Sequence, residues 1–265
     1  MERSTICVNT SDRPSPLRVL LNSLMIQTCM NFDIIIVDDG KSPAFTLEEA
    51  LCLQQTFKSL GVDCIYHKNT SRNGLSRSRN IGLDIMETGI GIFLDDDHIC
   101  DSRFVEFLIA TFDQKDNVGC VGALFPHVEG NIRYELEPPP VFGDILHDKE
   151  WGNWQRWYYP FTSNEDGIYP AIALGGIVAF RTDPKIQKDD RLSYVSHTED
   201  TMFSFRYLEE GYNNYVNIRA LAYHRLIGDG GCRTFQDADA QRDKDTNIFN
   251  DYLRHVKPII ELLKF

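Results

Sequence analysis

The chain has 265 residues, of which 42% are hydrophobic, so it can bury a core that suits one large domain or two small ones. Its formal net charge is -12 at pH 7 and it contains no long basic run, which argues against nucleic acid as the main partner and against docking on an anionic membrane. No apolar stretch approaches the roughly 20 residues that span a bilayer, and a strand-like segment begins directly after Ser4, without a signal-peptide pattern.

The cysteines are odd in number, are scattered along the chain and form no CxxC pair. They are Cys7, Cys29, Cys52, Cys64, Cys100, Cys120 and Cys232. This pattern indicates reduced, mostly buried thiols and argues against a disulfide framework or a zinc site. Together with the missing signal peptide and transmembrane segment, it predicts a cytoplasmic protein.

Strand-like and helix-like patterns alternate through the first half of the chain. Short apolar runs predict strands at residues 5–9, 32–37, 63–67 and 91–94. Apolar residues at helical spacing predict helices at residues 17–27, 46–60, 75–87 and 102–112, the last with Ser102 as its N-cap. This order predicts an α/β fold with a parallel sheet that is covered by helices on both faces.

The second half of the chain has a less regular pattern. Residues 135–159 are rich in proline and aromatic residues and are predicted to be irregular, whereas residues 171–181 form an apolar stretch that contains Gly175 and Gly176. Further predictions are a helix at 198–210, a strand at 215–223, a glycine-rich loop at 228–231 and a helix at 247–264. We find no internal repeat and no linker that clearly separates two domains.

Three consecutive acids, Asp95, Asp96 and Asp97, follow the apolar run at residues 91–94. Adjacent carboxylates repel one another, so their position at the end of a buried strand suggests a divalent cation, which takes oxygen ligands and bridges a protein to phosphates. The segment from Thr10 to Arg13 and the pair Asp38-Asp39 follow two other predicted strands. Because ligands of parallel sheets bind at the carboxyl ends of the strands, we expect all three segments to share one crevice.

Six segments, in this order and spacing, resemble those of family 2 glycosyltransferases with the GT-A fold. They are the segments at residues 9–14, 36–40, 73–80, 93–97, 175–176 and 199–200. The resemblance covers roughly residues 4–225 and implies a mixed, mostly parallel central sheet flanked by helices. It implies one catalytic domain at 1–225, with a nucleotide-sugar half at 1–100 and an acceptor half at 101–225, followed by a C-terminal loop and helical extension at 226–265.

The resemblance implies a metal-dependent enzyme that moves a sugar from a nucleotide-diphosphate donor, with UDP favoured, to a hydroxyl of a glycan or another acceptor, with inversion. Mn²⁺ or Mg²⁺ is the implied cofactor. Asp97 is expected to bind the metal, Asp95 to contact the ribose, and Asp96 to lie on the nucleotide-sugar side. His224 is the expected third ligand, although a lone histidine is as often structural. His98 is expected to point away from the site.

For the nucleotide sugar, the resemblance implies contacts from Thr10 and Asp39 to the base and from Arg13 in the same segment. Arg79 and Asn80 are expected to line the nucleotide pocket, because arginine can pair with phosphate through two parallel hydrogen bonds. The alternative for these positions is an ordinary turn and a solvated helix face.

For the acceptor, the resemblance implies that Asp200 is the general base and that Glu199 orients the attacking group. The alternative, which is compatible, is that both acids begin a helix where its dipole favours them. Gly175 and Gly176 are expected to let the backbone approach the substrates closely, and a tight bend between core strands explains them equally well.

Two other functions fit parts of the sequence. A sugar-phosphate nucleotidyltransferase shares the α/β architecture, but it usually has a glycine-rich loop after the first strand, and residues 10–16 contain no glycine. A non-catalytic sugar-nucleotide-binding protein needs no base, so Asp200 argues against it. The sugar, the acceptor and the oligomeric state are not readable from the sequence.

Overall fold

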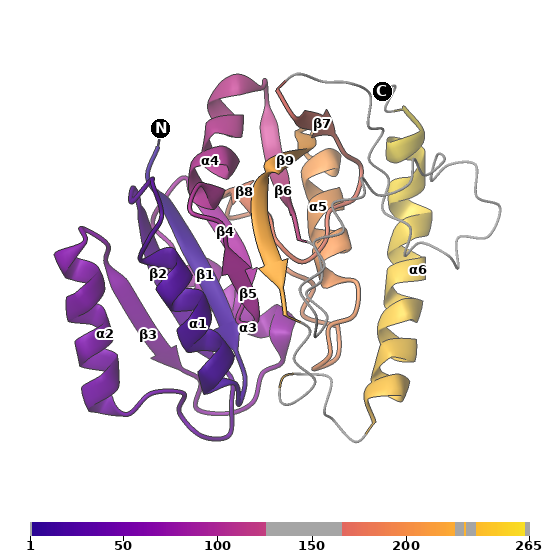
Figure 1. Cartoon of the computed structure of the whole chain (residues 1–265). Coiled ribbons are helices and arrows are strands. Elements are labelled where there is room, and N and C mark those ends of the chain that lie inside the picture. Colours follow the sequence, from indigo (N-terminus) through magenta and orange to yellow (C-terminus); the bar gives the residue numbers. More distant parts are fainter. Residues whose placement is uncertain (1, 126–165, 226–230, 232–236, 263–265) are drawn as a thin grey trace.

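A computed structural model describes residues 2–125, 166–225, 231 and 237–262 (Figure 1). The segment 135–159, which was predicted to be irregular, lies outside the described residues, as do residues 228–230 of the predicted glycine-rich loop. Within the described part of the chain, every helix is too short or too polar to cross a lipid bilayer.

The described residues form one mixed sheet with helices on both faces, which confirms the predicted α/β architecture (Figure 1). The strand order is β3-β2-β1-β4-β8-β6-β9-β5, and β7 pairs with β9. The strands are β1 (Ser4–Thr10), β2 (Phe32–Asp38), β3 (Cys64–Lys68), β4 (Ile90–Asp95), β5 (His98–Cys100), β6 (Val118–Leu124), β7 (Ile168–Pro170), β8 (Val178–Arg181) and β9 (Asn213–His224).

The first four strands are parallel, as predicted, and they place the ends of β1, β2 and β4 side by side. Thr10 pairs with Asp38, and Asn9 pairs with Asp95. The later strands mix both directions, since β8 is antiparallel to β4 and β6, whereas β9 is parallel to β6 and antiparallel to β5. The short strand β5 therefore lies against the end of β9, beside the acids that follow β4.

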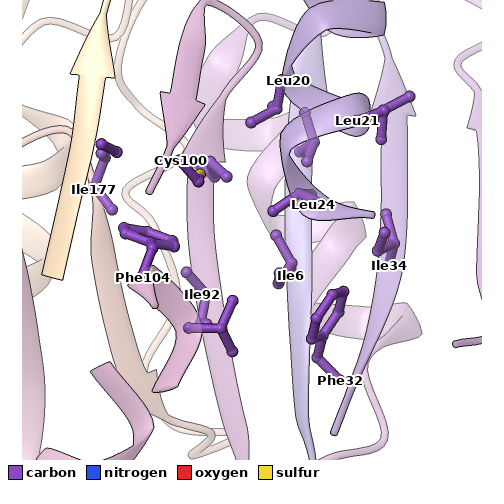
Figure 2. Packing of buried hydrophobic residues seen from close by; sticks show 14 of the residues in the cluster. Ile6, Leu20, Leu21, Leu24, Phe32, Ile34, Ile92, Cys100, Phe104 and Ile177 are labelled. Carbon is purple, nitrogen blue, oxygen red and sulfur yellow. The ribbon is translucent and has the colours of Figure 1, made fainter. Parts of the chain in front are cut away.

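The helices divide between the two faces of the sheet because successive side chains of a strand point to opposite sides. One face carries α1 (Pro14–Leu24), α2 (Leu47–Ser59) and α4 (Phe104–Gln114), and the other carries α3 (Leu75–Ile85) and α5 (Glu199–Glu209). Figure 2 shows Leu24 of α1 beside Ile6 of the sheet, in the cluster that also contains Leu20 and Ile34. The last helix, α6 (Ala238–Leu262), packs on α5 through a separate hydrophobic cluster.

Helix boundaries differ from the predictions where local chemistry overrides apolar spacing. The first helix begins at Pro14, because proline suits the first turn of a helix, where no backbone N–H is required. The predicted cap Ser102 is wrong: α4 begins at Phe104 with Arg103 at the N-cap position and no side-chain cap. The carbonyl of Ser102 instead accepts a hydrogen bond from the backbone N–H of Thr28, at 2.8 Å.

Candidate active site

A cleft of about 790 Å³ opens at the carboxyl ends of β1, β2 and β4. The three strand-end segments line it, as predicted, together with the N-terminal part of α3. Its opposite wall comes from Gly176, residues 194–198 and the first two residues of α5, with His224, Gly231 and Arg242 at its edge. The cleft thus brings together residues that are more than 200 positions apart in the sequence.

The acidic turn after β4 meets two histidines. The pairing of β5 with β9 places His98 directly opposite His224, and their rings stack with centroids 4.6 Å apart. The Asp97 carboxylate oxygen Oδ1 lies 3.4 Å from Nε2 of His224 and 3.7 Å from Nδ1 of His98. His98 therefore points into the acidic cluster, contrary to the expectation that it points away.

Asp97, His98 and His224 offer three atoms, all within 4.8 Å of one another, that fit a divalent metal ion. Ligands about 2.1 Å from an ion lie about 3 Å apart at a right angle and about 4.2 Å apart when opposite. The distances from Asp97 to the two histidines, 3.4 and 3.7 Å, fall in this range. Burial lowers the pKa of His98, which favours the neutral imidazole that can bind a metal. The donor set of one carboxylate and two imidazoles therefore suits such an ion.

Asp96 and Asp97 have different protonation properties although they are adjacent. Burial raises the pKa of Asp96 to about 7, even though Thr10 and Arg13 donate hydrogen bonds to its carboxylate, at 2.6 and 3.1 Å. Burial also acts to raise the pKa of Asp97, but the hydrogen bond with His224 and the charge of nearby groups, Arg13 among them, outweigh it and hold that pKa well below its usual range. Asp97 is thus the carboxylate of the pair that stays ionised.

Asp39 lies at the β2 side of the cleft and shapes its wall. Its Oδ1 accepts hydrogen bonds from the Asn69 side chain and the Asn73 backbone, and its Oδ2 accepts one from the Gly74 backbone, all at 2.7–2.9 Å. Gly74 has φ of +81°, and a Cβ atom there would lie 2.6 Å from the Cα of Tyr194. The neighbouring Asp38 is fully buried and binds elsewhere, to backbone N–H groups of Gly40 and Ala44.

Arg79 lies at the floor of the cleft instead of extending into it. Only 1% of the residue is exposed, and its guanidinium pairs with Glu199 and, at 2.8 Å, with Asp95. The other carboxylate oxygen of Glu199 lies 2.5 Å from Nζ of Lys188, whose side chain is fully buried against Phe203. Arg79, Glu199 and Lys188 thus form a buried ion triad, with Asp95 as a fourth, partly exposed member.

The triad affects the protonation of the two acids that begin α5. Burial acts to raise the pKa of Glu199, but the charges of Arg79 and Lys188 outweigh it and lower that pKa. Burial and then the charge of Glu199 raise the pKa of Asp200. Its Oδ2 accepts a hydrogen bond of 2.6 Å from the backbone N–H of Gly176, which has φ of +58°. Asp200 is therefore a half-buried carboxylate, with enhanced basicity, at the edge of the cleft.

Two predicted site residues do not line the cleft. Asn80 exchanges hydrogen bonds with the backbone of Lys188, at 2.8 and 3.0 Å, on the far side of α3. Gly175 is buried beside Gly176, which does line the cleft. Conversely, sequence reasoning missed Lys188, which belongs to no motif, and it discarded His98, whose position after the triple acid was a usable signal.

Comparison with known proteins gives the family. The model of the family described as Glycosyl transferase family 2 matches residues 5–186. An uncharacterized glycosyltransferase of Haemophilus influenzae is 30% identical over 117 residues, which cover 44% of this chain and 37% of that protein. Glycosyltransferase GlyA of Streptococcus pneumoniae serotype 4 is 25% identical over 152 residues, which cover 57% of this chain and 20% of that protein. The chain thus spans well under half the length of these relatives.

Three solved structures with bound nucleotide or nucleotide sugar have a similar fold. The first is GalNAc-T7 with UDP, GalNAc and Mn²⁺ (TM-score 0.63, 18% identity, 85% of this chain and 44% of that one). The second is residues 1–349 of S. aureus TarS with UDP-GlcNAc (TM-score 0.62, 15% identity, 99% of this chain and 68% of that one). The third is the mannosyltransferase PcManGT of Pyrobaculum calidifontis with GDP-Man and Mn²⁺ (TM-score 0.61, 14% identity, 99% of this chain and 65% of that one). At these identities the likeness establishes the GT-A fold. Because the family model matches more than half of the chain, the chain belongs to glycosyl transferase family 2.

Proposed function

We propose that the chain is a metal-dependent, inverting glycosyltransferase that moves a sugar from a UDP-sugar to an acceptor hydroxyl. One observation carries this proposal: the cleft is lined both by Asp97 and His224, which with His98 could hold a cation, and by a half-buried carboxylate, Asp200. The first suits a diphosphate leaving group, and the second suits a nucleophile that must lose a proton.

The donor would lie along the ends of β1, β2 and β4. Asp39 uses three of its roughly four acceptor positions within the protein, which leaves one on Oδ2 for an imide N–H such as that of uracil. Asp95, the most exposed of the three acids, suits a ribose hydroxyl, with 35% of its side chain accessible. Two of the three similar structures named above contain UDP or UDP-GlcNAc, and the third contains GDP-Man, so UDP is the favoured base.

Asp97, His98 and His224 would hold the metal. Imidazole nitrogens are ligands of transition-metal ions, whereas Mg²⁺ prefers oxygen, so this set favours Mn²⁺. When bound, the ion would act as a Lewis acid that stabilises the negative charge of the departing diphosphate. Arg13, which donates to Asp97 at 2.8 Å, is placed to contribute positive charge at the same end of the cleft.

Asp200 would remove the proton of the acceptor hydroxyl as that oxygen attacks the anomeric carbon. The new bond joins the acceptor oxygen to the sugar, the bond from the sugar to UDP breaks, and the proton passes to the Asp200 carboxylate. The backbone N–H of Gly176 orients this carboxylate, at 2.6 Å. Glu199 is held by two cations, so Asp200 is the acid of the pair that is free to act as a base, which supports a single displacement with inversion.

The test is UDP release from a panel of UDP-sugars with Mn²⁺, with and without a chelator, in the wild type, Asp97→Ala and the exposed control Asp116→Ala. We expect Asp97→Ala and chelation each to lower release by roughly 100-fold or more, because charge stabilisation of the leaving group is lost. The control should match the wild type. Activity that survives both treatments would refute the metal role, and pyrophosphate release from a nucleoside triphosphate would instead support a nucleotidyltransferase.

A further inference from the structure

The C-terminal helix α6 contributes a fully buried carboxylate, Asp245, close to the cleft. Its Oδ1 accepts a hydrogen bond from the Ser193 backbone, at 2.7 Å, and its Oδ2 accepts two more, from the Ser193 hydroxyl at 2.7 Å and the His197 backbone at 2.8 Å. A buried carboxylate needs such donors, and all three come from one loop.

That loop, residues 193–198, forms the wall of the cleft directly before Glu199 and Asp200, and residues 194–198 line the cleft itself. Ser196 and Thr198 have φ of +51° and +71°, in the left-handed region that non-glycine residues rarely adopt. Such conformations persist only where surrounding contacts impose them. The hydroxyl of Ser196 also accepts a hydrogen bond of 3.0 Å from the Ser76 backbone, so the loop joins α6 to the first turn of α3.

The packing of α6 makes it a firm support for this loop. Phe249, Leu253 and Val256 are almost completely buried in a cluster with Phe205 and Leu208 of α5. Figure 1 shows α6 lying alongside α5, on the side of the molecule away from β1 to β3. The helix that carries Asp245 is thus fixed to the helix that begins with Asp200. One turn before Asp245, Arg242 lines the same cleft.

We propose that α6 forms the acceptor-side wall of the active site, and that Asp245 is a positioning residue that sets the loop 193–198 and so the orientation of Asp200. This inference rests on the proposed transfer reaction. The family match ends at residue 186, so it assigns no role to this loop or to α6. The carboxylates of Asp39 and Asp97 follow β2 and β4, at the donor end of the cleft. The loop touches this end where Tyr194 packs on Gly74, so we expect Asp245 to affect donor binding less than it affects Asp200.

Asp245→Asn tests the role with almost no change in shape. An amide has one acceptor end, so its NH₂ group must face either the Ser193 N–H or the His197 N–H, and one hydrogen bond is replaced by a repulsion. Asp251→Asn is the matched control, because Asp251 lies on the same helix and 72% of its side chain is exposed.

We expect Asp245→Asn to lower kcat for UDP release by roughly 10- to 100-fold, since small misplacements of reacting groups cost this much. The donor is whichever of UDP-glucose, UDP-galactose and UDP-GlcNAc the wild type turns over fastest. The Kd for UDP with Mn²⁺ should stay within about 3-fold of the control. Hydrogen exchange of peptides that cover residues 193–198 should accelerate at the same time. A kcat within about 3-fold of Asp251→Asn, or unchanged exchange of the loop, would overturn the proposal.

Ser193→Ala is a milder variant that removes one of the three donors to Asp245. It should lower kcat less than Asp245→Asn, and the double variant should resemble Asp245→Asn alone, because both changes break the same contact. Fully additive effects would contradict the positioning role even if Asp245→Asn folds poorly. If the wild type releases no UDP from any donor, the proposed function fails. The hydrogen exchange of residues 193–198, compared between Asp245→Asn and Asp251→Asn, then decides by itself whether Asp245 holds the loop.

Discussion

Glu199→Gln is predicted to destabilise the protein through the cation that it leaves behind. In the wild type, Glu199 is 4% exposed and pairs with both Arg79 and Lys188. Arg79 keeps a second carboxylate, Asp95, at 2.8 Å. Among the described residues, Glu199 is the carboxylate that pairs with Lys188, whose side chain has no exposed surface. The substitution thus keeps the shape of the side chain and removes the counter-charge of a buried ammonium group.

Breaking a buried ion pair by removing one partner costs about 3–5 kcal/mol, because an uncompensated charge remains in a medium of low polarity. For a domain of this size, that corresponds to a fall in Tm of roughly 6–20 °C. The double variant Lys188→Met/Glu199→Gln should recover at least half of this loss, because an apolar side chain of similar length replaces the stranded charge.

The loss should also depend on pH. Burial already lowers the pKa of Lys188 to about 8, against the opposing charge of Glu199, and the substitution removes that charge and lowers the pKa further. A folded-state pKa below the unfolded value of about 10.4 means that the unfolded chain binds more protons between the two values, so stability rises with pH in that window. In Glu199→Gln the folded-state pKa of Lys188 is lower, so this rise in stability begins at a lower pH than in the wild type. The stability that the variant has lost relative to the wild type should therefore shrink between pH 7 and pH 9.

Thermal unfolding of the wild type and of the single and double variants at pH 7 and pH 9 checks this reasoning. Asp251→Asn, which removes a solvent-exposed partner of Arg254, is a control that should change Tm little. If Glu199→Gln shifts Tm no more than this control, or if the double variant is as unstable as the single one, the triad does not act as a buried ion cluster.

Three further outcomes follow from the site. Asp200→Asn should lower UDP release by roughly 10²- to 10⁴-fold, as expected for a general base, while calorimetry shows unchanged UDP binding. Burial and the charge of Glu199 raise the pKa of Asp200, so wild-type activity should fall on acidification at a higher pH than an ordinary aspartate allows. In Glu199→Gln that charge is removed, so this acidic limb of the pH–rate profile should move to lower pH. Gly176→Ala should cost about 1–2 kcal/mol in urea unfolding, because φ there is +58°.

The sequence was sufficient to predict the parallel half of the sheet and the crevice at its strand ends. Apolar runs that end in polar residues mark both features, and neighbouring parallel strands must bring such ends together. Thr10 pairs with Asp38 in the structure, and Asn9 pairs with Asp95, so the polar segments after three separate strands do meet. Asp39 and Asp97 line the cleft for the same reason.

The roles of side chains that depend on distant partners could not be predicted in this way. Arg79 was expected to reach phosphate, but its guanidinium pairs with Glu199, 120 residues later in the chain. His98 faces the acidic cluster because β5 pairs with β9, and no pattern in the sequence indicates a three-residue strand at this position. The helix α6 begins nine residues before the predicted start, because residues 238–246 are mostly polar and show no apolar period, although Asp245 is buried there.

The central claim is that a cation held by Asp97 and its two histidines makes a nucleoside diphosphate able to leave the sugar. Diffraction from crystals grown with UDP and Mn²⁺, measured at the manganese absorption edge, tests it most directly. The account predicts one anomalous peak within about 2.3 Å of the Asp97 carboxylate and of the His224 ring, with diphosphate oxygens on its open side. A nucleotide bound in the cleft with no manganese peak beside Asp97 would contradict it.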